Sequence, residues 1–143
     1  MNSNDSQIED DEALFASSIE LQDFARACAN DLPHATLDHP FGAESDVFRI
    51  ISKIFMIVSD AKGEPVITVK AEPTHVSALI QQFSSIAPGY HMSKSHWVSV
   101  QAGEGITRGL VAELVTNAYL VVIEGLPRAK RPVLPDHLNS YLR

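Results

Sequence analysis

The chain has 143 residues, a formal net charge of −7, and 45% hydrophobic and 20% charged residues. This length suits one domain with its own core, and the composition excludes a wholly disordered chain. The apolar runs are far too short to cross a bilayer, and the acidic balance disfavours a polyanionic partner. With no signal sequence visible and Cys28 as the only cysteine, we expect a soluble, monomeric protein of the reducing cytoplasm.

The N-terminal part predicts a tail followed by a helix. Residues 1–12 are mostly Asn, Ser, Asp and Glu and offer too little apolar surface to offset the entropy of ordering, so we expect a disordered acidic tail over residues 1–16. A helix is predicted from Ser17, because Ser17 and Glu20 have the spacing of a capping box, and it should end at residues 30–33. Cys28 falls on the apolar stripe of this helix, where a thiol acts as an inert small hydrophobe.

Residues 35–71 change from helical to extended periodicity, with many β-branched and aromatic side chains. The pattern predicts an antiparallel meander of three strands joined by turns. These are a weak edge strand over 36–41, a long strand over 47–59 with a bulge or bend at Ser52-Lys53, and a strand over 65–71 after a hairpin at 60–63.

The second half predicts two more helices around a short hairpin. Pro73 starts a helix that ends near Ser85, and a long apolar helix over about 110–122 should stop at Gly125 in a left-handed conformation. Between them, a turn at Pro88-Gly89 leads into extended runs over 90–93 and 97–100. Residues 128–143 are Pro-rich and basic and are expected to form a loosely held tail with a turn of helix at 137–142.

The predicted fold is therefore α+β with two layers, in the order α-β-β-β-α-β-β-α. About five antiparallel strands form one sheet, with the helices packed on one face. We expect a single domain over residues 17–127, flanked by the two tails.

Residues 88–97 read Pro-Gly-Tyr-His-Met-Ser-Lys-Ser-His-Trp. This stretch resembles the signature of the bacterial MmcQ/YjbR family, whose usual form is close to PGYHMNKKHW before a short strand. Lys53-Ile54-Phe55 resembles the family's GKIFA segment, and residues 118–121 resemble its SYxLV helix. The resemblance covers roughly residues 21–126.

The resemblance implies a CyaY-like or secretion-chaperone-like α+β fold and DNA binding of the "double wing" type, the label that this family carries. This sequence has Ser93 where the family usually has Asn, and Ser95 where it has a second lysine, so only Lys94 keeps the charge. Since each phosphate contact adds to salt-dependent affinity, we expect weaker DNA binding than for the family at large.

His91 and His96 are candidate ligand contacts, but their pattern does not predict a metal site or a catalytic centre. No carboxylate or cysteine lies between them, and metal sites need three or four converging ligands. Ser93 and Ser95 are close in sequence, yet no nucleophile elbow and no orienting acid accompany them. We therefore expect no cofactor and no metal, and histidines that hydrogen-bond the loop backbone.

The signature residues Pro88, Gly89, Tyr90 and Trp97 are expected to build and anchor the turn. Trp97 is interpreted as a core anchor between the sheet and the last helix, although stacking on a base or aromatic ligand is the alternative. Candidate basic contacts on the outer face of the sheet, to be joined by Lys94, are Arg49, Lys53 and Lys70.

These observations favour a non-enzymatic cytoplasmic binding module. Its ligand surface would be the Pro88–Trp97 loop and the outer sheet face, with weak DNA binding as the specific version. The alternative is a protein-interaction or chaperone-like adaptor, whose acidic tail would prefer basic partners. A hydrolase that uses His91 or His96 is a third, remote hypothesis.

Overall fold

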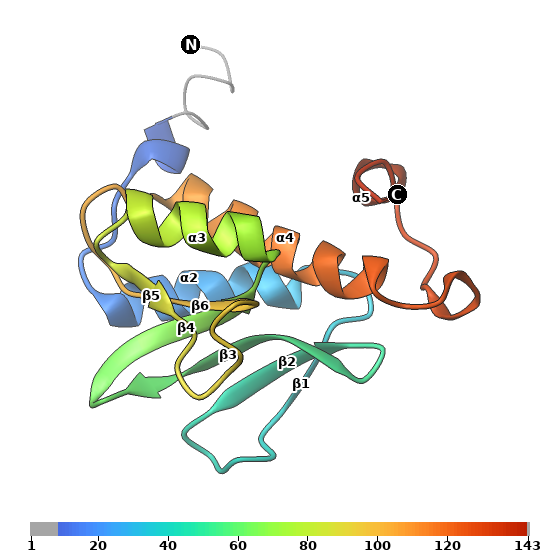
Figure 1. Ribbon diagram of the computed structural model, residues 1–143, viewed down its shortest axis with the longest axis horizontal. Helices are drawn as coiled ribbons and strands as arrows, with labels where there is room; N and C mark the ends of the chain where they lie inside the picture. Colours follow the sequence, from blue (N-terminus) through green and yellow to red (C-terminus); the bar gives the residue numbers. More distant parts are fainter. Residues whose placement is uncertain (1–8, 143) are drawn as a thin grey trace.

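A computed structural model describes residues 9–142 of the chain (Figure 1). Six antiparallel strands form one open sheet in the order β1-β2-β3-β4-β6-β5, and the helices α2, α3 and α4 lie together on one side of it (Figure 1). This arrangement confirms the predicted two-layer α+β fold. The strands are β1 (Thr36–Asp38), β2 (Asp46–Ile50), β3 (Lys53–Ala61), β4 (Glu64–Lys70), β5 (Ile86–Pro88) and β6 (Trp97–Val100).

The three main helices begin where the sequence predicts them. The first is α2 (Ser18–Asn30), whose N-cap Ser17 accepts a hydrogen bond from the backbone N–H of Glu20 at 3.1 Å, as in a capping box. In α3 (Pro73–Gln82), a proline occupies the first helical turn, where its missing N–H costs nothing. The third is α4 (Arg108–Glu124), which starts at the N-cap Thr107.

The predicted long strand over 47–59 is wrong, because the chain reverses at Ile51-Ser52 and forms two strands, β2 and β3. Both turn residues have positive φ values, 48° for Ile51 and 67° for Ser52. Tight hairpins of this kind usually carry Asn-Gly or another Gly-rich pair, so the Ile-Ser sequence hides the turn. The irregularity in the ladder lies between Phe48 and Arg49, and the sheet gains a sixth strand.

Two further local predictions are wrong, one in the signature stretch and one at the end of the last helix. The extended run ahead of the signature is β5 at Ile86–Pro88, whereas residues 90–93 belong to the following loop, in which His91 has a φ of 59°. Gly125 ends α4 with a φ of −75°, an ordinary right-handed value, and its N–H still bonds to carbonyls of the last turn. The expected left-handed stop is therefore absent at Gly125.

The two faces of the sheet differ in what covers them. Met56, Val69 and Val98 follow one another across β3, β4 and β6, and all three belong to the core beneath the helices. The next positions along the strands, such as Thr68 and Ser99, point to the opposite side, which we call the outer face. Helices cover the first face, and the outer face carries the features of the candidate site.

Both flanking segments contact the domain where they are described. The backbone N–H of Arg108 donates to the carbonyl of Ala13 at 2.9 Å, and the Phe15 ring packs against Phe24. In the C-terminal stretch, Leu134 and Leu138 are buried and join the core, and a short helix, α5, spans Asp136–Asn139. The predicted acidic tail falls partly on residues 1–8, outside the described residues, and the division at 16 and 127 stays a prediction.

Candidate functional site

The Pro88–Trp97 signature forms a loop that folds back over the outer face of the sheet. The backbone N–H of Gly89 donates to the carbonyl of Trp97 at 2.8 Å, which closes the loop at its base. The N–H of Tyr90 donates to Ser99 Oγ at 3.0 Å, and this hydroxyl also bonds to Thr68 Oγ1 at 2.8 Å. Two buried hydroxyls of the outer face therefore hold the start of the loop.

Trp97 is buried as predicted, but on the other side of the sheet. It is the register partner of Lys70, one position from the core pair Val69 and Val98, so its side chain lies on the outer face. Its exposed fraction is only 7% because the loop covers it, and the Lys70 ammonium lies 5.8 Å from its ring centre. The interpretation of Trp97 as an anchor beneath the last helix is corrected: it anchors the loop.

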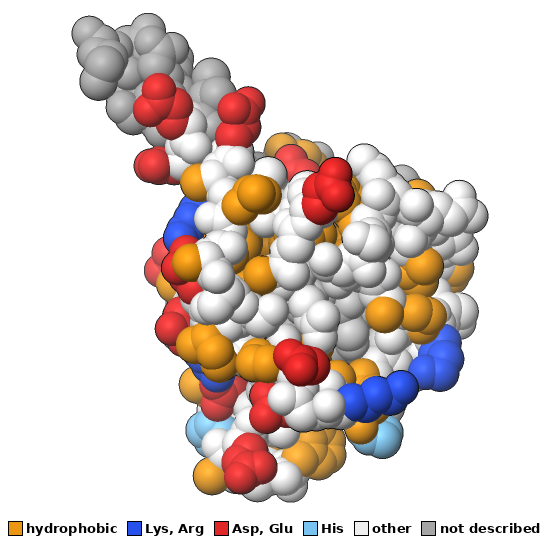
Figure 2. Space-filling view, turned by 90° about the vertical axis from the view of Figure 1, so that its left-hand side faces the viewer, with side chains coloured by type: hydrophobic (Ala, Val, Ile, Leu, Met, Phe, Trp, Pro, Cys, Tyr) orange, Lys and Arg blue, Asp and Glu red, His pale blue; other side chains and the backbone are white. Residues whose placement is uncertain are grey.

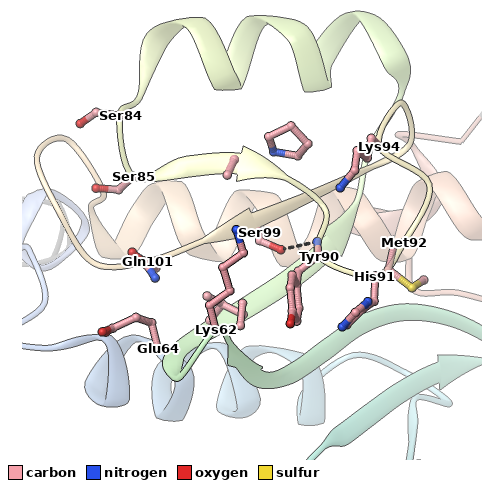
Figure 3. A pocket seen from close by; sticks show the side chains of 14 residues that line it. Lys62, Glu64, Ser84, Ser85, Tyr90, His91, Met92, Lys94, Ser99 and Gln101 are labelled. Atoms are coloured by element: carbon pink, nitrogen blue, oxygen red, sulfur yellow. Dashed lines mark hydrogen bonds between the residues drawn. The ribbon is translucent and has the colours of Figure 1, made fainter.

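The loop and the strands enclose a hollow of about 830 Å³, which we call the loop hollow (Figure 3). Its walls are the β3–β4 hairpin, the segment before β5, the end of β6, and the loop itself. Volumes of this order are typical of small-molecule sites. The lining residues are Ala61, Lys62, Glu64, Val66, Ser84, Ser85, Ala87, Pro88, Tyr90, His91, Met92, Lys94, Ser99 and Gln101.

Basic groups and the acidic Glu64 occupy different ends of the loop hollow. Lys94 and His91 lie at one end, whereas Glu64, Gln101 and the serines Ser84 and Ser85 lie at the other (Figure 3). Lys62 extends from the β3–β4 turn into the space between them (Figure 3). Among residues 9–142, none of the ion pairs involves these two lysines or this glutamate.

A smaller hollow of about 420 Å³ adjoins the first across the loop. The two share Tyr90, His91 and Met92, so the tip of the loop is the wall between them. The smaller hollow contains the carboxylates of Glu44 and Asp60 and no lysine or arginine. The loop thus separates a hollow with two lysines from one with two acids.

The predicted basic face does not form as one surface. Arg49 pairs with Asp38 at 3.3 Å, and Lys70 lies against Trp97. Since the adjacent register pairs are Arg49 with Ile54 and Ile50 with Lys53, Arg49 and Lys53 point to opposite sides of the ladder. Of the six predicted contact residues, Lys94 and His91 line the loop hollow, whereas Arg49, Lys53, Lys70 and His96 do not.

Basic side chains are also sparse on one side of the molecule, the side that Figure 2 shows. Figure 2 shows the side of the molecule that lies on the left in Figure 1. Acidic side chains gather there on the N-terminal segment and along one flank, and the clearest basic side chains lie together at the lower right edge (Figure 2). A broad basic surface of the kind that nucleic-acid binding requires is not visible on this side.

The histidines of the signature are exposed and do not assemble a recognisable catalytic group. In residues 9–142, no three side chains of His, Cys, Asp or Glu come together in a way that could hold a metal ion. The His91 ring packs against its neighbour Tyr90 at an interplanar angle of 50°, with 4.0 Å between ring centres, and Ser93 Oγ lies 3.4 Å from Ser95 Oγ. These contacts organise the loop and place no base beside a nucleophile.

The clearest shifts in pKa lie outside the loop hollow. Burial raises the pKa of Asp46, but hydrogen bonds from Arg26 and His39 outweigh this effect, so its pKa lies below the ordinary value. Burial raises the pKa of Tyr119 to about 12, and burial followed by the charge of Asp31 raises that of Cys28. A raised pKa keeps the Cys28 thiol protonated, consistent with its predicted inert role.

Several residues of the loop hollow were missed by sequence reasoning, among them Lys62, Glu64, Ser85 and Gln101. Lys62, Glu64 and Gln101 belong to segments that were predicted as a turn or as strand ends, whereas Ser85 was predicted at the end of a helix that stops at Gln82. What the sequence does not show is that β4 pairs with β6 and that the signature loop folds back along β6. Together these features place the 61–64 turn and the loop around one hollow. The alternation of Val66, Thr68 and Lys70 marks the residues of β4 that lie on the outer face. It was the one sequence signal that could have placed this strand beside the hollow.

Fold and site together define a small α+β protein with an open antiparallel sheet, helices on one face and a loop-covered hollow on the other. Residues 30–121 match the YjbR family, and the chain belongs to this family. The predicted resemblance is therefore confirmed.

Known relatives and solved structures agree with this assignment. The chain is 42% identical over 108 residues to the uncharacterized protein YbdF of Escherichia coli O157:H7, covering 76% of this chain and 88% of the relative. It is 28% identical to the uncharacterized protein YjbR of Escherichia coli K12 over 86 residues, 60% of this chain and 73% of the relative. These relatives carry no described activity in their names, so the family shows the fold and not the function.

A crystal structure of a Deinococcus radiodurans protein with a DUF419 domain superposes with a TM-score of 0.67 and 31% identity, covering 82% of this chain and 86% of that one. A Pseudomonas syringae structure has a TM-score of 0.54 and 23% identity, over 70% and 93% of the two chains, and supports the fold alone. None of the helices described over residues 9–142 is long and apolar enough to span a bilayer.

Proposed function

We propose that this YjbR-family protein is a non-enzymatic binding module, and that the loop hollow is its ligand site. The observation that carries the proposal is the pair of lysines, Lys62 and Lys94, that point into one hollow without an ion-pair partner among the described residues. Pockets with a few convergent polar groups on a partly apolar wall are the usual form of small-molecule sites. Val66, Pro88 and Met92 supply the apolar part.

The walls of the loop hollow are held by structure that does not depend on a ligand. Lys62 and Gly63, at φ values of 53° and 83°, form the tight turn between β3 and β4. Gln22 of α2 donates its side-chain N–H groups to the carbonyls of Ser59 and Val66 at 2.9 and 3.0 Å. A site placed on strands and tight turns is preorganised, which reduces the entropy lost on binding.

His91 also fits a binding role for the loop. Its φ of 59° is uncommon for a residue with a side chain, and it lies at the tip that separates the two hollows. Strained backbone of this kind occurs often at ligand sites. We propose that His91 contacts the ligand and has no catalytic role.

The DNA-binding version of the module receives less support from the geometry. Arg49 is paired, Lys53 points away from Arg49, and Lys70 lies against Trp97, so Lys94 lacks the basic face that was expected to join it. The adaptor alternative would use exposed apolar side chains such as Phe41, which is 67% exposed beside the smaller hollow. The adaptor alternative does not explain the two lysines that face one hollow. The DNA version could use both lysines, but it lacks the broader basic face that duplex binding needs.

Amide chemical shifts in a ¹⁵N-labelled sample test the proposal. The protein would be titrated with a library of neutral, anionic and cationic small molecules at millimolar concentration. We expect binders to shift the amide signals of Lys62, Tyr90, Lys94 and Gln101 together. Binders that instead shift residues of the α3–α4 side, such as His75 and Tyr141, or a library without any binder, would contradict the proposal.

A further inference from the structure

We propose that the ligand of the loop hollow is a small organic phosphate whose body carries hydroxyl or amine groups. This inference rests on the proposed function and adds the chemical class of the ligand. It follows from the order of the groups along the hollow: Lys94 at one end, Lys62 in the middle, and Glu64 with Gln101 at the far end (Figure 3).

The two lysines account for the anionic group. Both residues are exposed and their side chains point into the hollow (Figure 3), and among residues 9–142 neither has an ion-pair partner. A phosphate monoester carries between one and two negative charges at neutral pH, which two ammonium groups can match. Charge-assisted hydrogen bonds of this type are stronger than neutral ones, so the anion supplies much of the affinity.

The floor of the hollow offers the ligand mainly apolar surface. Ser99 Oγ is already engaged by Thr68 Oγ1 and by the N–H of Tyr90, so it has little capacity left for a ligand. Polar recognition therefore comes from the rim. Apolar atoms of Val66 and Pro88 and the Tyr90 ring remain as a surface for the body of the ligand.

The far end explains why the ligand is more than an inorganic ion. Glu64, Gln101 and the hydroxyls of Ser84 and Ser85 line this end, and the carboxylate accepts hydrogen bonds only. It therefore selects a donor, either a hydroxyl or an amine. The volume of about 830 Å³ also leaves ample space beyond a phosphate group.

Titrations with matched pairs of probes test this class. Glucose 6-phosphate, glucose, adenosine 5′-monophosphate, adenosine and inorganic phosphate would each be titrated by calorimetry and by the fluorescence of Trp97, the single tryptophan, at low and high salt. We expect at least one of the two phosphate esters to bind at least about 10-fold more tightly than its parent, as the loss of a charged hydrogen bond predicts. Its affinity should fall at high salt.

Charge-removing variants give the second half of the test. Lys62→Gln and Lys94→Gln should each weaken the phosphate ester about 10-fold. Glu64→Gln should weaken it less, and the exposed Lys53→Gln, outside the hollow, should leave it unchanged.

The outcomes separate this inference from the proposed function. Equal affinity for esters and parents, or unchanged affinity in both lysine variants, would overturn the phosphate class, while neutral molecules that shift the hollow amides would still support the proposed site. Inorganic phosphate that binds as tightly as the esters would overturn recognition of the body. Binding of a random DNA duplex, but of neither ester, with the same lysine dependence would overturn the class in favour of nucleic acid.

Discussion

Gly89 and Trp97 approach so closely that a Cβ atom on Gly89 would lie 2.4 Å from the Cβ of Trp97. Their backbones are also joined by the hydrogen bond from Gly89 N–H to the Trp97 carbonyl. Since no side chain fits between them, glycine is the residue that allows the loop to return onto the outer face. This contact closes the base of the signature loop.

Gly89→Ala should therefore destabilise the protein by about 1–3 kcal/mol, as overpacking does, and displace the loop. We expect a lower midpoint in urea and a red shift of Trp97 fluorescence, because the ring becomes more exposed to water. Gly125→Ala is the matched control: Gly125 has a φ of −75°, and its nearest contact is an ordinary 3.4 Å. A G89A variant as stable as G125A, with unchanged fluorescence, would contradict this account of the loop.

The buried Gln22 should matter more than its place on a helix suggests. It is 5% exposed, and its side-chain amide donates to the carbonyls of Ser59 and Val66. Gln22→Leu leaves these carbonyls without that donor, so the free energy of unfolding should fall by about 1–2 kcal/mol. Gln81→Leu, at an exposed position of α3, should change it little, and equal effects in the two variants would count against the structural role of Gln22.

Asp46 should make stability depend on pH in the acid range. Arg26 and His39 bond to its two carboxylate oxygens at 2.6 and 2.7 Å, and its folded-state pKa is lowered. The unfolded chain therefore binds more protons just below the ordinary value of about 4, so stability is present above that pH and is lost as the pH falls through the folded pKa.

Asp46→Asn should weaken this loss and lower stability at pH 7 by about 1 kcal/mol, measured by urea unfolding between pH 3 and pH 7. Asp23→Asn is the control, because Asp23 also pairs with Arg26 but its side chain is 69% exposed. The same pH profile in D46N and in the unchanged protein would rule out this assignment.

Tyr119 should titrate late and hold the N-terminal half to α4. Its ring packs edge-on against Phe55, its hydroxyl donates to the Pro33 carbonyl at 2.7 Å, and its pKa is raised to about 12. The raised folded-state pKa means that its contribution is complete below about pH 10, the ordinary value, and is lost as pH rises through about 12.

Absorbance at alkaline pH should show a tyrosine that ionises near 12 in the folded protein and is missing in Tyr119→Phe. The variant should also lose about 1 kcal/mol at pH 7, because the carbonyl of Pro33 loses its donor while the ring contact remains. Tyr141→Phe, at a position that is 70% exposed, should remove neither the late titration nor the stability. A late titration that persists in Y119F would refute the assignment.

The sequence predicted the elements whose signals are local. The Ser17 capping box, Pro73 at the start of α3 and the β-branched run of β6 each mark their element directly. The turn at Ile51-Ser52 was hidden because neither residue is typical of positive φ. The face taken by Trp97 was missed because it depends on the register with Lys70, which no local pattern encodes.

The sequence indicated the loop side of the candidate site but not the side formed by the β3–β4 turn. The signature stretch was singled out from the sequence, and five of its residues line the loop hollow: Pro88, Tyr90, His91, Met92 and Lys94. Lys62 was not found, because it shares a hollow with Lys94 only through two non-local features: the pairing of β4 with β6, and the fold-back of the signature loop along β6. Non-local strand order of this kind is the part of a fold that sequence periodicity does not reveal.

A crystal structure of the protein with the most tightly bound molecule from the library tests the central claim most directly. We predict that the molecule lies between Lys62 and Lys94, against the Tyr90 ring, with its polar end toward Glu64. A molecule bound instead in the groove lined by His75 and Tyr141 on the helical side would contradict the claim that the loop hollow is the ligand site.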